Sequence, residues 1–214
     1  MLYGVIDIGS NTIRLMIYRV DNGAIHPVLN NKFAAGLAGY ITAKGKMSKE
    51  GIRKAVEVLT ELRTVTEQIT LDGVFPFGTA ALRNITNTQE VLDAIRAESG
   101  FAVRVLSGEE EAEFDYYGAL QSTPLDGGLL VDVGGGTTGI SVLKDGKVIF
   151  TGDEPTGGTH MTLVLAGFHG WNTQEAELAK RDPAQEANVF PVIKPVVEKM
   201  ASIVRNYLRE YPVE

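Results

Sequence analysis

The sequence has 214 residues, of which 44% are hydrophobic and 22% are charged, as in a soluble globular protein with a sizeable core. Its net charge of −7 argues against a nucleic-acid partner, and the absence of cysteine excludes disulfides, thiolate catalysis and cysteine-ligated metals. No apolar run approaches the ~20 residues of a membrane span and no basic-then-apolar signal segment follows Met1, so we expect a cytoplasmic protein with no membrane partner.

The chain opens on a predicted β-hairpin. Leu2–Ile8 and Thr12–Val20 read as two strands joined by a tight turn of small residues, and Asp7 stands at the end of the first strand. Ala24–Phe33 is a plausible third strand, in which Pro27 favours an edge position.

A long helix and a buried strand follow a glycine-rich loop. Ser48 is a helix cap, and apolar residues then recur at helical spacing as far as Ile69. Val74–Gly78 is a short buried strand that leads into Thr79–Arg83. Taken alone, this last segment reads as a surface helix turn with a solvated arginine.

Three acids open a further helix over Ser107–Leu120. Acidic side chains at a helix N-terminus are favoured by the helix dipole, which is a sufficient structural explanation for Glu109–Glu111. The functional alternative is that one of them points into a cleft and activates a water. The polar connector Gln121–Gly128 is the predicted boundary, which gives domains 1–124 and 125–214.

The stretch Leu129–Phe150 carries the strongest chemical signal. A short apolar strand ends at Asp132, and three glycines then leave backbone N–H groups uncovered, so that an anionic oxygen can approach them. Two threonines add hydroxyl donors before a second strand. The structural alternative is an ordinary glycine-rich hairpin; the functional one is a phosphate loop made of Gly134, Gly135, Gly136, Thr137 and Thr138.

The same pattern occurs twice in the chain. When the two hairpins are aligned at one offset, Asp7 matches Asp132, Gly9 matches Gly134 and Thr12 matches Thr137. An internal repeat of this kind implies two similar subdomains. We therefore expect two loops around one cleft that grip a phosphate chain, with one carboxylate from each available to Mg²⁺.

A second candidate phosphate cradle lies further on. Gly157 and Gly158 precede a helix that starts near His160, and helix N-termini bind anions. Thr173–Lys180 is predicted to form a short helix and Val192–Leu208 the last one.

Four segments of the first half resemble a known family: VIDIGSNTIRLMIY, AGLAGYI, FGTAALRNITN and SGEEEAEFDYYGAL. They are similar to the first domain of the exopolyphosphatase and guanosine-pentaphosphatase (Ppx/GppA) family, which belongs to the superfamily of actin-like, sugar kinase and Hsp70 ATPases. The resemblance implies that Glu111 orients the attacking water and that Thr79 and Arg83 contact phosphate. It also implies a first phosphate loop that contains Asp7, Ser10, Asn11 and Thr12.

The second half resembles a different branch of the superfamily. DVGGGTTGISVLKDGKVI, DEPTGGTHMTLVLAG and KRDP are similar to EutJ, an Hsp70-like ATPase group, whereas the Ppx/GppA family usually carries a GGGSTE loop here. This change indicates a chimera joined between Ser122 and Gly134; a natural divergent member is the alternative.

The resemblance implies an α/β protein with the actin-like ATPase fold, that is, a duplicated ribonuclease-H-like fold. The first subdomain would hold a mixed five-stranded sheet with strand order 3-2-1-4-5. The second would be truncated before its adenosine-contacting loop. Its strand Leu129–Val133 would then be an unprotected edge, which predicts a homo-oligomer.

The predicted function is Mg²⁺-dependent hydrolysis of a phosphoanhydride, either polyphosphate or a guanosine polyphosphate. In this scheme Asp7 and Asp132 hold the metal, Arg83 neutralises charge and Glu111 positions or deprotonates water. Two alternatives stay open: an ATP-binding, chaperone-like ATPase, and a catalytically silent chain that binds phosphate weakly.

Overall fold

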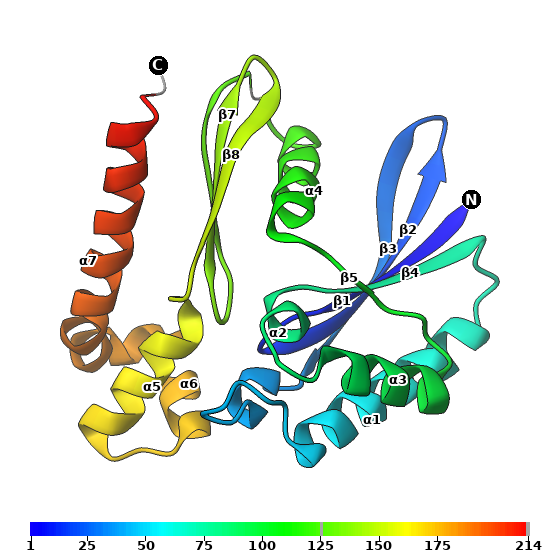
Figure 1. Cartoon of the computed structure of the whole chain (residues 1–214), viewed down its shortest axis with the longest axis horizontal. Helices are drawn as coiled ribbons and strands as arrows, with labels where there is room; N and C mark the ends of the chain where they lie inside the picture. The colour runs from blue at the N-terminus through cyan, green and yellow to red at the C-terminus, as the bar shows by residue number, and fades with distance from the viewer. Residues whose placement is uncertain (125, 213–214) are drawn as a thin grey trace. The chain divides into compact units, whose positions relative to one another are not determined.

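A computed structural model describes residues 1–124 and 126–212 of the chain (Figure 1). The chain divides into two compact units, Met1–Ser107 and Gly108–Glu214. The first unit is built on one sheet and the second on another, so that each unit has its own core.

The first unit contains a mixed five-stranded sheet with the order β3-β2-β1-β4-β5. Strand β1 pairs antiparallel with β2 and parallel with β4. This confirms the predicted sheet and strand order, and Pro27 lies as expected on an edge strand. The strands are β1 (Leu2–Ile8), β2 (Thr12–Asp21), β3 (Ala24–Ala34), β4 (Gly73–Gly78) and β5 (Arg104–Val105).

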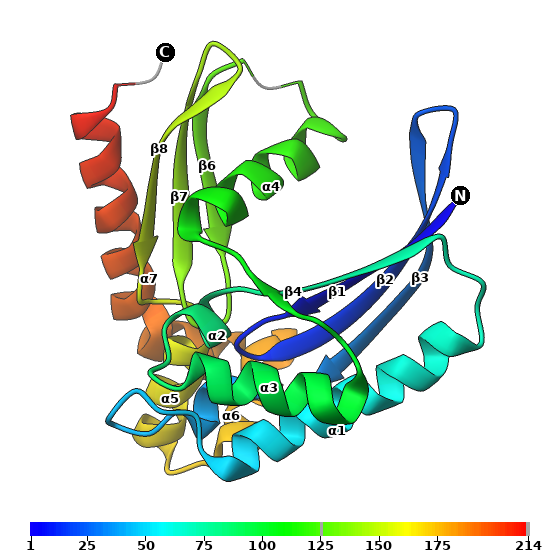
Figure 2. The same cartoon turned by 45° about the vertical axis from the view of Figure 1, so that its right-hand side comes forward.

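Two long helices lie side by side on one face of this sheet (Figure 2). The helices and the single 3-10 turn of the unit are η1 (Leu37–Tyr40), α1 (Lys49–Glu67), α2 (Ala80–Arg83) and α3 (Thr88–Ser99). Ser48 caps α1 as predicted, because its hydroxyl accepts a hydrogen bond from the Gly51 amide at 3.2 Å.

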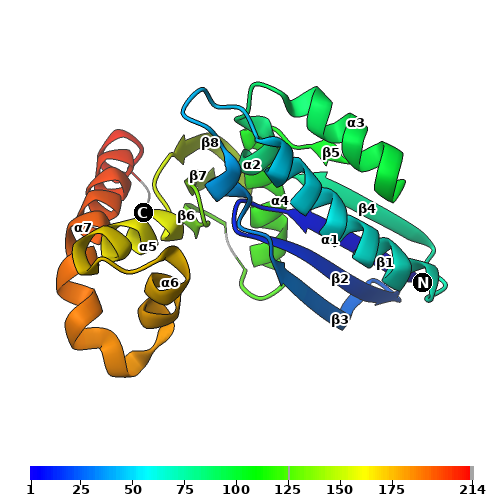
Figure 3. The ribbon, with the colours of Figure 1, turned by 90° about the horizontal axis from the view of Figure 1, so that it is seen from below.

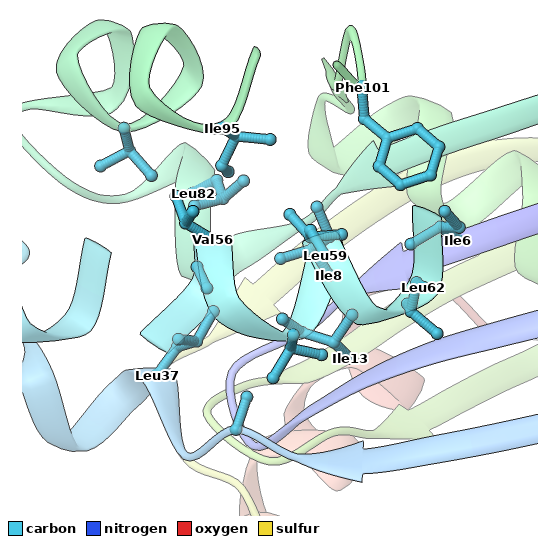
Figure 4. Close-up of a cluster of buried hydrophobic side chains, with 14 of the residues drawn as sticks. Ile6, Ile8, Ile13, Leu37, Val56, Leu59, Leu62, Leu82, Ile95 and Phe101 are labelled. Carbon is cyan, nitrogen blue, oxygen red and sulfur yellow. The ribbon is translucent and has the colours of Figure 1, made fainter. Parts of the chain in front are cut away.

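The core of the first unit joins the sheet to α1 and α3 (Figure 4). Alternate residues of β1 and β2 pack against the apolar stripe of α1. The apolar face of the strands and that of the helix therefore bury each other. The largest fully buried members are Ile6, Ile8, Ile13, Leu15, Ile17, Leu37, Met47, Leu59, Leu62, Leu82 and Ile95.

The second unit contains a three-stranded antiparallel sheet with the order β6-β7-β8. Helix α4 packs on one face of this sheet, and α7 lies along the other, where the ring of Phe150 stacks on Tyr211 with centroids 4.6 Å apart (Figure 1). The elements are α4 (Gly108–Leu120), β6 (Gly128–Val133), β7 (Thr138–Lys144), β8 (Lys147–Glu154) and α7 (Glu186–Glu210).

A group of helices completes this unit (Figure 3). Helix α5 (Gly158–His169) packs against α6 (Thr173–Arg181) and α7, and a short 3-10 turn, η2 (Pro183–Gln185), joins the last two. The buried residues that hold the group together are Leu165, Ala176 and Val189.

The boundary between the units differs from the predicted one. The units divide after Ser107, whereas the sequence placed the boundary between residues 124 and 125. The reason is that α4 packs on β7 and β8 and so shares their core. Polar composition located the connector, but it carries no information on where the preceding helix packs.

The last helix also begins earlier than expected. Pro191 and Pro195 both lie inside α7, which starts at Glu186 rather than at Val192. A proline removes one backbone donor, but the buried side chains of Val189 and Met200 anchor the helix on both sides of the two prolines. Within residues 1–124 and 126–212, no helix is long and apolar enough to cross a membrane.

Candidate functional site

The first glycine loop is a closed turn between β1 and β2. Asp7 pairs with Arg14 in the last part of the ladder, and the Gly9 amide then donates to the Thr12 carbonyl oxygen at 3.0 Å. The loop is tied from outside as well: the carbonyls of Asn11 and Ser10 accept from the amides of residues 36 and 38, each at 2.9 Å. The loop is therefore held both by its own closing hydrogen bond and by the segment that follows β3.

The second loop repeats the first in register. Asp132 pairs with Gly139 and Val133 with Thr138, and the Gly134 amide donates to the Thr137 carbonyl at 2.9 Å. Each of these pairs corresponds to a pair of the first hairpin displaced by 125 residues. The repeat predicted from the sequence therefore exists in the backbone geometry.

The second loop is held from behind by the first turn of α5. The amide of Gly158 donates to the Gly134 carbonyl at 2.9 Å, and that of Thr159 donates to the Gly135 carbonyl at 2.8 Å. A Cβ atom on Gly157 would lie 2.6 Å from the Gly134 carbonyl oxygen, so only glycine permits this approach.

Some of the predicted phosphate ligands are already occupied by hydrogen bonds within the protein. The amides of Gly157 and Gly158 already donate inside the protein, to His160 Nδ1 at 3.1 Å and to the loop at 2.9 Å. The hydroxyl of Thr138 is buried and donates to the Thr156 carbonyl at 2.6 Å. These three residues therefore support the loop. The Gly134 amide is likewise occupied by the Thr137 carbonyl, so the amides of Gly135 and Gly136 and the Thr137 hydroxyl are left to face a ligand.

Two carboxylates flank a glycine across the second sheet. Asp132 on β6 and Asp153 on β8 both pair with Gly139 of β7, so the three residues form one row on one face. Because Gly139 has no side chain, a Cβ placed there would lie 3.7 Å from Asp153 Oδ1 and 3.9 Å from Asp132 Cβ. The two acids therefore share one small space.

That space is a cavity of about 60 Å³. Helix α4 closes it with Glu111 and Asp115, and the loop contributes Thr137. The structure thus brings the predicted catalytic Glu111 and the predicted metal ligand Asp132 to one cavity of the second unit. Glu110 is not among the residues that line it.

The electrostatics of the cavity favour a cation. Loss of water around the carboxyl group raises the pKa of Asp132, and the negative charge of Asp153 raises it further. Within the described residues, no group of three carboxylates or histidines is placed to enclose a metal. One or two carboxylates fit Mg²⁺, which keeps several waters and takes its remaining ligands from phosphate.

The remaining predicted residues lie in the first unit at the carboxyl ends of β1 and β4. Strand β4 runs parallel to β1, with Gly78 opposite Ile8, and Thr79 follows directly, its amide 3.4 Å from the Ile8 carbonyl. Arg83 ends α2 and donates to the Leu106 carbonyl at 2.9 Å. Thr79 therefore lies beside the strand end that carries Asp7.

The comparisons with known proteins agree with this geometry. Residues 16–203 match the model of the Ppx/GppA phosphatase family. The chain belongs to this family.

Individual relatives of this Ppx/GppA family member come from both branches seen in the sequence. Ethanolamine utilization protein EutJ of Salmonella typhimurium is 52% identical over 84 residues, which are 39% of this chain and 29% of EutJ. The crystal structure of an exopolyphosphatase from Cytophaga hutchinsonii has a TM-score of 0.70 and 26% identity over 94% of this chain and 64% of its own. That of EutJ from Carboxydothermus hydrogenoformans has a TM-score of 0.69 and 28% identity over 99% and 72%.

The chain therefore covers less than a third of the length of the Salmonella relative and less than two thirds of the Cytophaga exopolyphosphatase. These structures share the actin-like ATPase fold, which confirms the predicted fold class. The family match extends across residues 122–134, where the sequence predicted the junction of a chimera; the chimera stays a prediction.

Sequence analysis did not identify Asp153 as a site residue. Its position opposite Asp132 depends on the registers of β6, β7 and β8, and the register of β7 and β8 shifts between Val142 and Leu143. The sequence does show an acid on the second strand after the predicted ligand Asp132. Only the correct register of the three strands, however, places the two acids next to each other.

Proposed function

We propose that the chain is a Mg²⁺-dependent phosphoanhydride hydrolase that acts on polyphosphate or a guanosine polyphosphate. The observation that carries this proposal is the cavity in which Glu111 and Asp132 meet beside a glycine loop. Membership of the Ppx/GppA phosphatase family supports the same reaction class.

The residues then divide the work as follows. Backbone amides of the first loop near Gly9 and of Gly135 and Gly136 in the second loop bind phosphate oxygens, and the guanidinium of Arg83 neutralises their charge. Asp7 and Asp132 would hold Mg²⁺, which when bound supplies charge neutralisation. Glu111 accepts a proton from water as the water oxygen attacks the terminal phosphorus; the bridging P–O bond breaks and the shortened chain leaves.

Replacing Glu111→Gln tests this assignment, because it removes the base and keeps the size of the side chain. We expect phosphate release from polyphosphate to fall by about 10²–10⁴-fold, with the affinity for tripolyphosphate nearly unchanged. Glu113→Gln is the matched control: Glu113 is exposed on the same helix and does not line the cavity. Equal rates for Glu111→Gln and the parent would sink the assignment.

ATP hydrolysis is the second candidate function, and the 52% identity to EutJ favours it. Phosphate release from polyphosphate, guanosine pentaphosphate and ATP, each with and without Mg²⁺, separates the two candidates. If phosphate loops dominate binding, affinity follows phosphate number and ATP and GTP compete equally. A strong preference for adenine supports the ATPase, and no release from any substrate supports a silent phosphate binder.

A homo-oligomer formed through β6 remains part of this proposal. Strand β6 is an edge of its sheet, and its Val131 and Val133 are 37% and 52% exposed. Unpaired edge strands with apolar side chains invite pairing with another chain. Light scattering over a range of concentrations tests it, and a concentration-independent monomer contradicts it.

A further inference from the structure

A lysine ammonium lies behind the second phosphate loop. The side chain of Lys180 on α6 is only 16% exposed. Its Nζ donates to the Gly158 carbonyl at 3.0 Å and to the Thr162 hydroxyl at 2.8 Å, and it forms an ion pair with Glu177 at 2.5 Å. Thr162 is itself buried, and its hydroxyl lies 2.6 Å from Glu177 Oε2 and 3.1 Å from the Gly158 carbonyl oxygen, so the three partners of the ammonium also contact one another.

The charge of this network is not balanced. Glu177 also pairs with Arg181, whose Nη2 lies 2.6 Å from its other oxygen, so two cations share one carboxylate. Burial alone would raise the pKa of Glu177, but hydrogen bonds from Lys180, Thr162 and Arg181 together lower it below its ordinary value. The carboxylate stays ionised and one positive charge remains in excess beside the start of α5.

Two peptide groups connect this charge to the loop. The Gly158 carbonyl, which accepts from Lys180, belongs to the same peptide group as the Thr159 amide, which donates to the Gly135 carbonyl at 2.8 Å. The Gly135 carbonyl in turn shares its peptide group with the Gly136 amide. In a trans peptide the C=O and N–H point in opposite directions, so anchoring one carbonyl aims the next N–H away from α5.

The Gly135 and Gly136 amides at the end of this path are available donors. No acceptor within residues 1–124 and 126–212 receives a hydrogen bond from either of them. Hydrogen bonds in a chain polarise one another, so a cation at the first carbonyl strengthens each donor that follows. The path ends on the backbone group that meets a phosphate oxygen in the proposed function.

We propose that Lys180 is a positioning residue of the second phosphate loop: it fixes and polarises the Gly158–Thr159 peptide, which holds the Gly135 carbonyl and aims the Gly136 amide at phosphate. This inference rests on the proposed function, because it assigns phosphate to the same loop. It adds a residue on α6 that does not touch the ligand and acts through two backbone groups.

Lys180→Met tests the proposal, since it removes the charge and keeps the aliphatic stem. We expect roughly tenfold weaker binding of inorganic tripolyphosphate by titration calorimetry with Mg²⁺, the usual scale for losing one charge-assisted hydrogen bond. Lys180→Arg should recover most of the affinity. Arg181→Leu is the matched control: it loses the same carboxylate partner without touching Gly158, and its affinity should stay within about twofold of the parent.

Glu177→Gln separates positioning by charge from simple support of the fold. A purely structural network predicts weaker binding for both Lys180→Met and Glu177→Gln. Positioning by charge predicts unchanged or tighter binding for Glu177→Gln. In this variant the ammonium of Lys180 keeps its place, and no negative charge of residue 177 offsets its positive charge. Equal losses in the two variants would therefore overturn the proposal, even if Lys180→Met also lowers the melting temperature.

Hydrogen exchange of the Thr159 amide provides a readout independent of any ligand. Exchange should be roughly tenfold faster in Lys180→Met than in the parent and unchanged in Arg181→Leu. Unchanged exchange in Lys180→Met overturns the proposal. If the parent does not bind tripolyphosphate, the proposed function fails, while the Thr159 measurement still decides whether Lys180 holds the loop.

Discussion

The two glycine hairpins have the same strand register, but the residues that pack around them differ. In the first, β1 is a central strand, and Ile6, Ile8 and Ile13 are fully buried in a core that includes α1. In the second, β6 is an edge strand with Val131 and Val133 exposed. The first hairpin is thus buried on both of its strands, whereas the second is buried mainly on β7, at Ile140 and Val142, and its loop also depends on polar contacts from α5 and α6.

This difference indicates where each loop is vulnerable. Core packing spreads support over many side chains, each with a large free energy of burial, whereas a chain of hydrogen bonds depends on every member. The first loop should therefore respond mainly to core truncation, and the second to single changes near the start of α5. The following substitutions test that contrast.

Leucine truncation in the two cores should give the largest effect. Leu59 on α1 and Leu165 on α5 are both fully buried, but Leu59 belongs to a much larger cluster. We expect Leu59→Ala to lower the free energy of unfolding of its unit by roughly 3–5 kcal/mol and Leu165→Ala by roughly 2–3 kcal/mol. Hydrogen exchange of the slowest amides of β2 and β7 measures the two units separately. A larger loss for Leu165→Ala contradicts the contrast.

Gly157→Ala should give an intermediate effect. Its new Cβ would meet the carbonyl oxygens of Gly134 and Gly135 at 2.6 and 2.8 Å, and both are backbone atoms that cannot turn away. We expect a loss of roughly 1–3 kcal/mol in unfolding free energy, together with weaker tripolyphosphate binding. Thermal or denaturant unfolding and titration calorimetry measure the two quantities.

Gly167→Ala is the matched control for this change. Gly167 lies within α5, the helix that Gly157 caps, and no atom stands within 4 Å of a Cβ placed there. Alanine is the better helix former, so this variant should gain roughly 0.5–1 kcal/mol and bind tripolyphosphate normally. Should both glycine variants behave alike, the close approach of α5 to the loop is not what supports it.

Sequence reasoning reached the elements with strong local signals. The cap at Ser48 and the apolar stripe of α1 are set by neighbouring residues, and the structure contains both. The repeat of Asp7 at Asp132 was visible because both hairpins keep one offset. The two hairpins could therefore be predicted from the residues themselves, whereas the fold class and strand order followed from the family resemblance.

What the sequence missed depends on contacts between distant segments. Asp153 joins Asp132 only through the register of three strands, and α4 falls in the second unit only because of how it packs. The donors of Gly157 and Gly158 looked free in the sequence, since nothing there shows that the loop carbonyls occupy them. Side-chain roles of this kind need the three-dimensional partner.

Asp132→Asn should give the smallest effect and the most informative one for the second loop. The pKa of Asp132 is raised by loss of water and then by Asp153, so the charged carboxylate is less favourable in the folded than in the unfolded chain. Because Asp132 is still partly exposed, solvent screening limits the cost, and Asn should stabilise by only about 0.5 kcal/mol at pH 7 without Mg²⁺. The gain should vanish as the pH falls below the ordinary aspartate value of 3.8, where the carboxyl is protonated in both states.

Mg²⁺ should reverse the order of stability of Asp132→Asn and the parent. It should raise the melting temperature of the parent but not of the variant, since a ligand of the folded state stabilises it. Asp21→Asn, in the exposed end of β2, serves as control and should show neither effect. Melting curves between pH 3 and pH 8 with and without Mg²⁺ measure both, and a variant less stable than the parent at pH 7 without metal would show that Asp132 is a structural acid rather than a cation ligand.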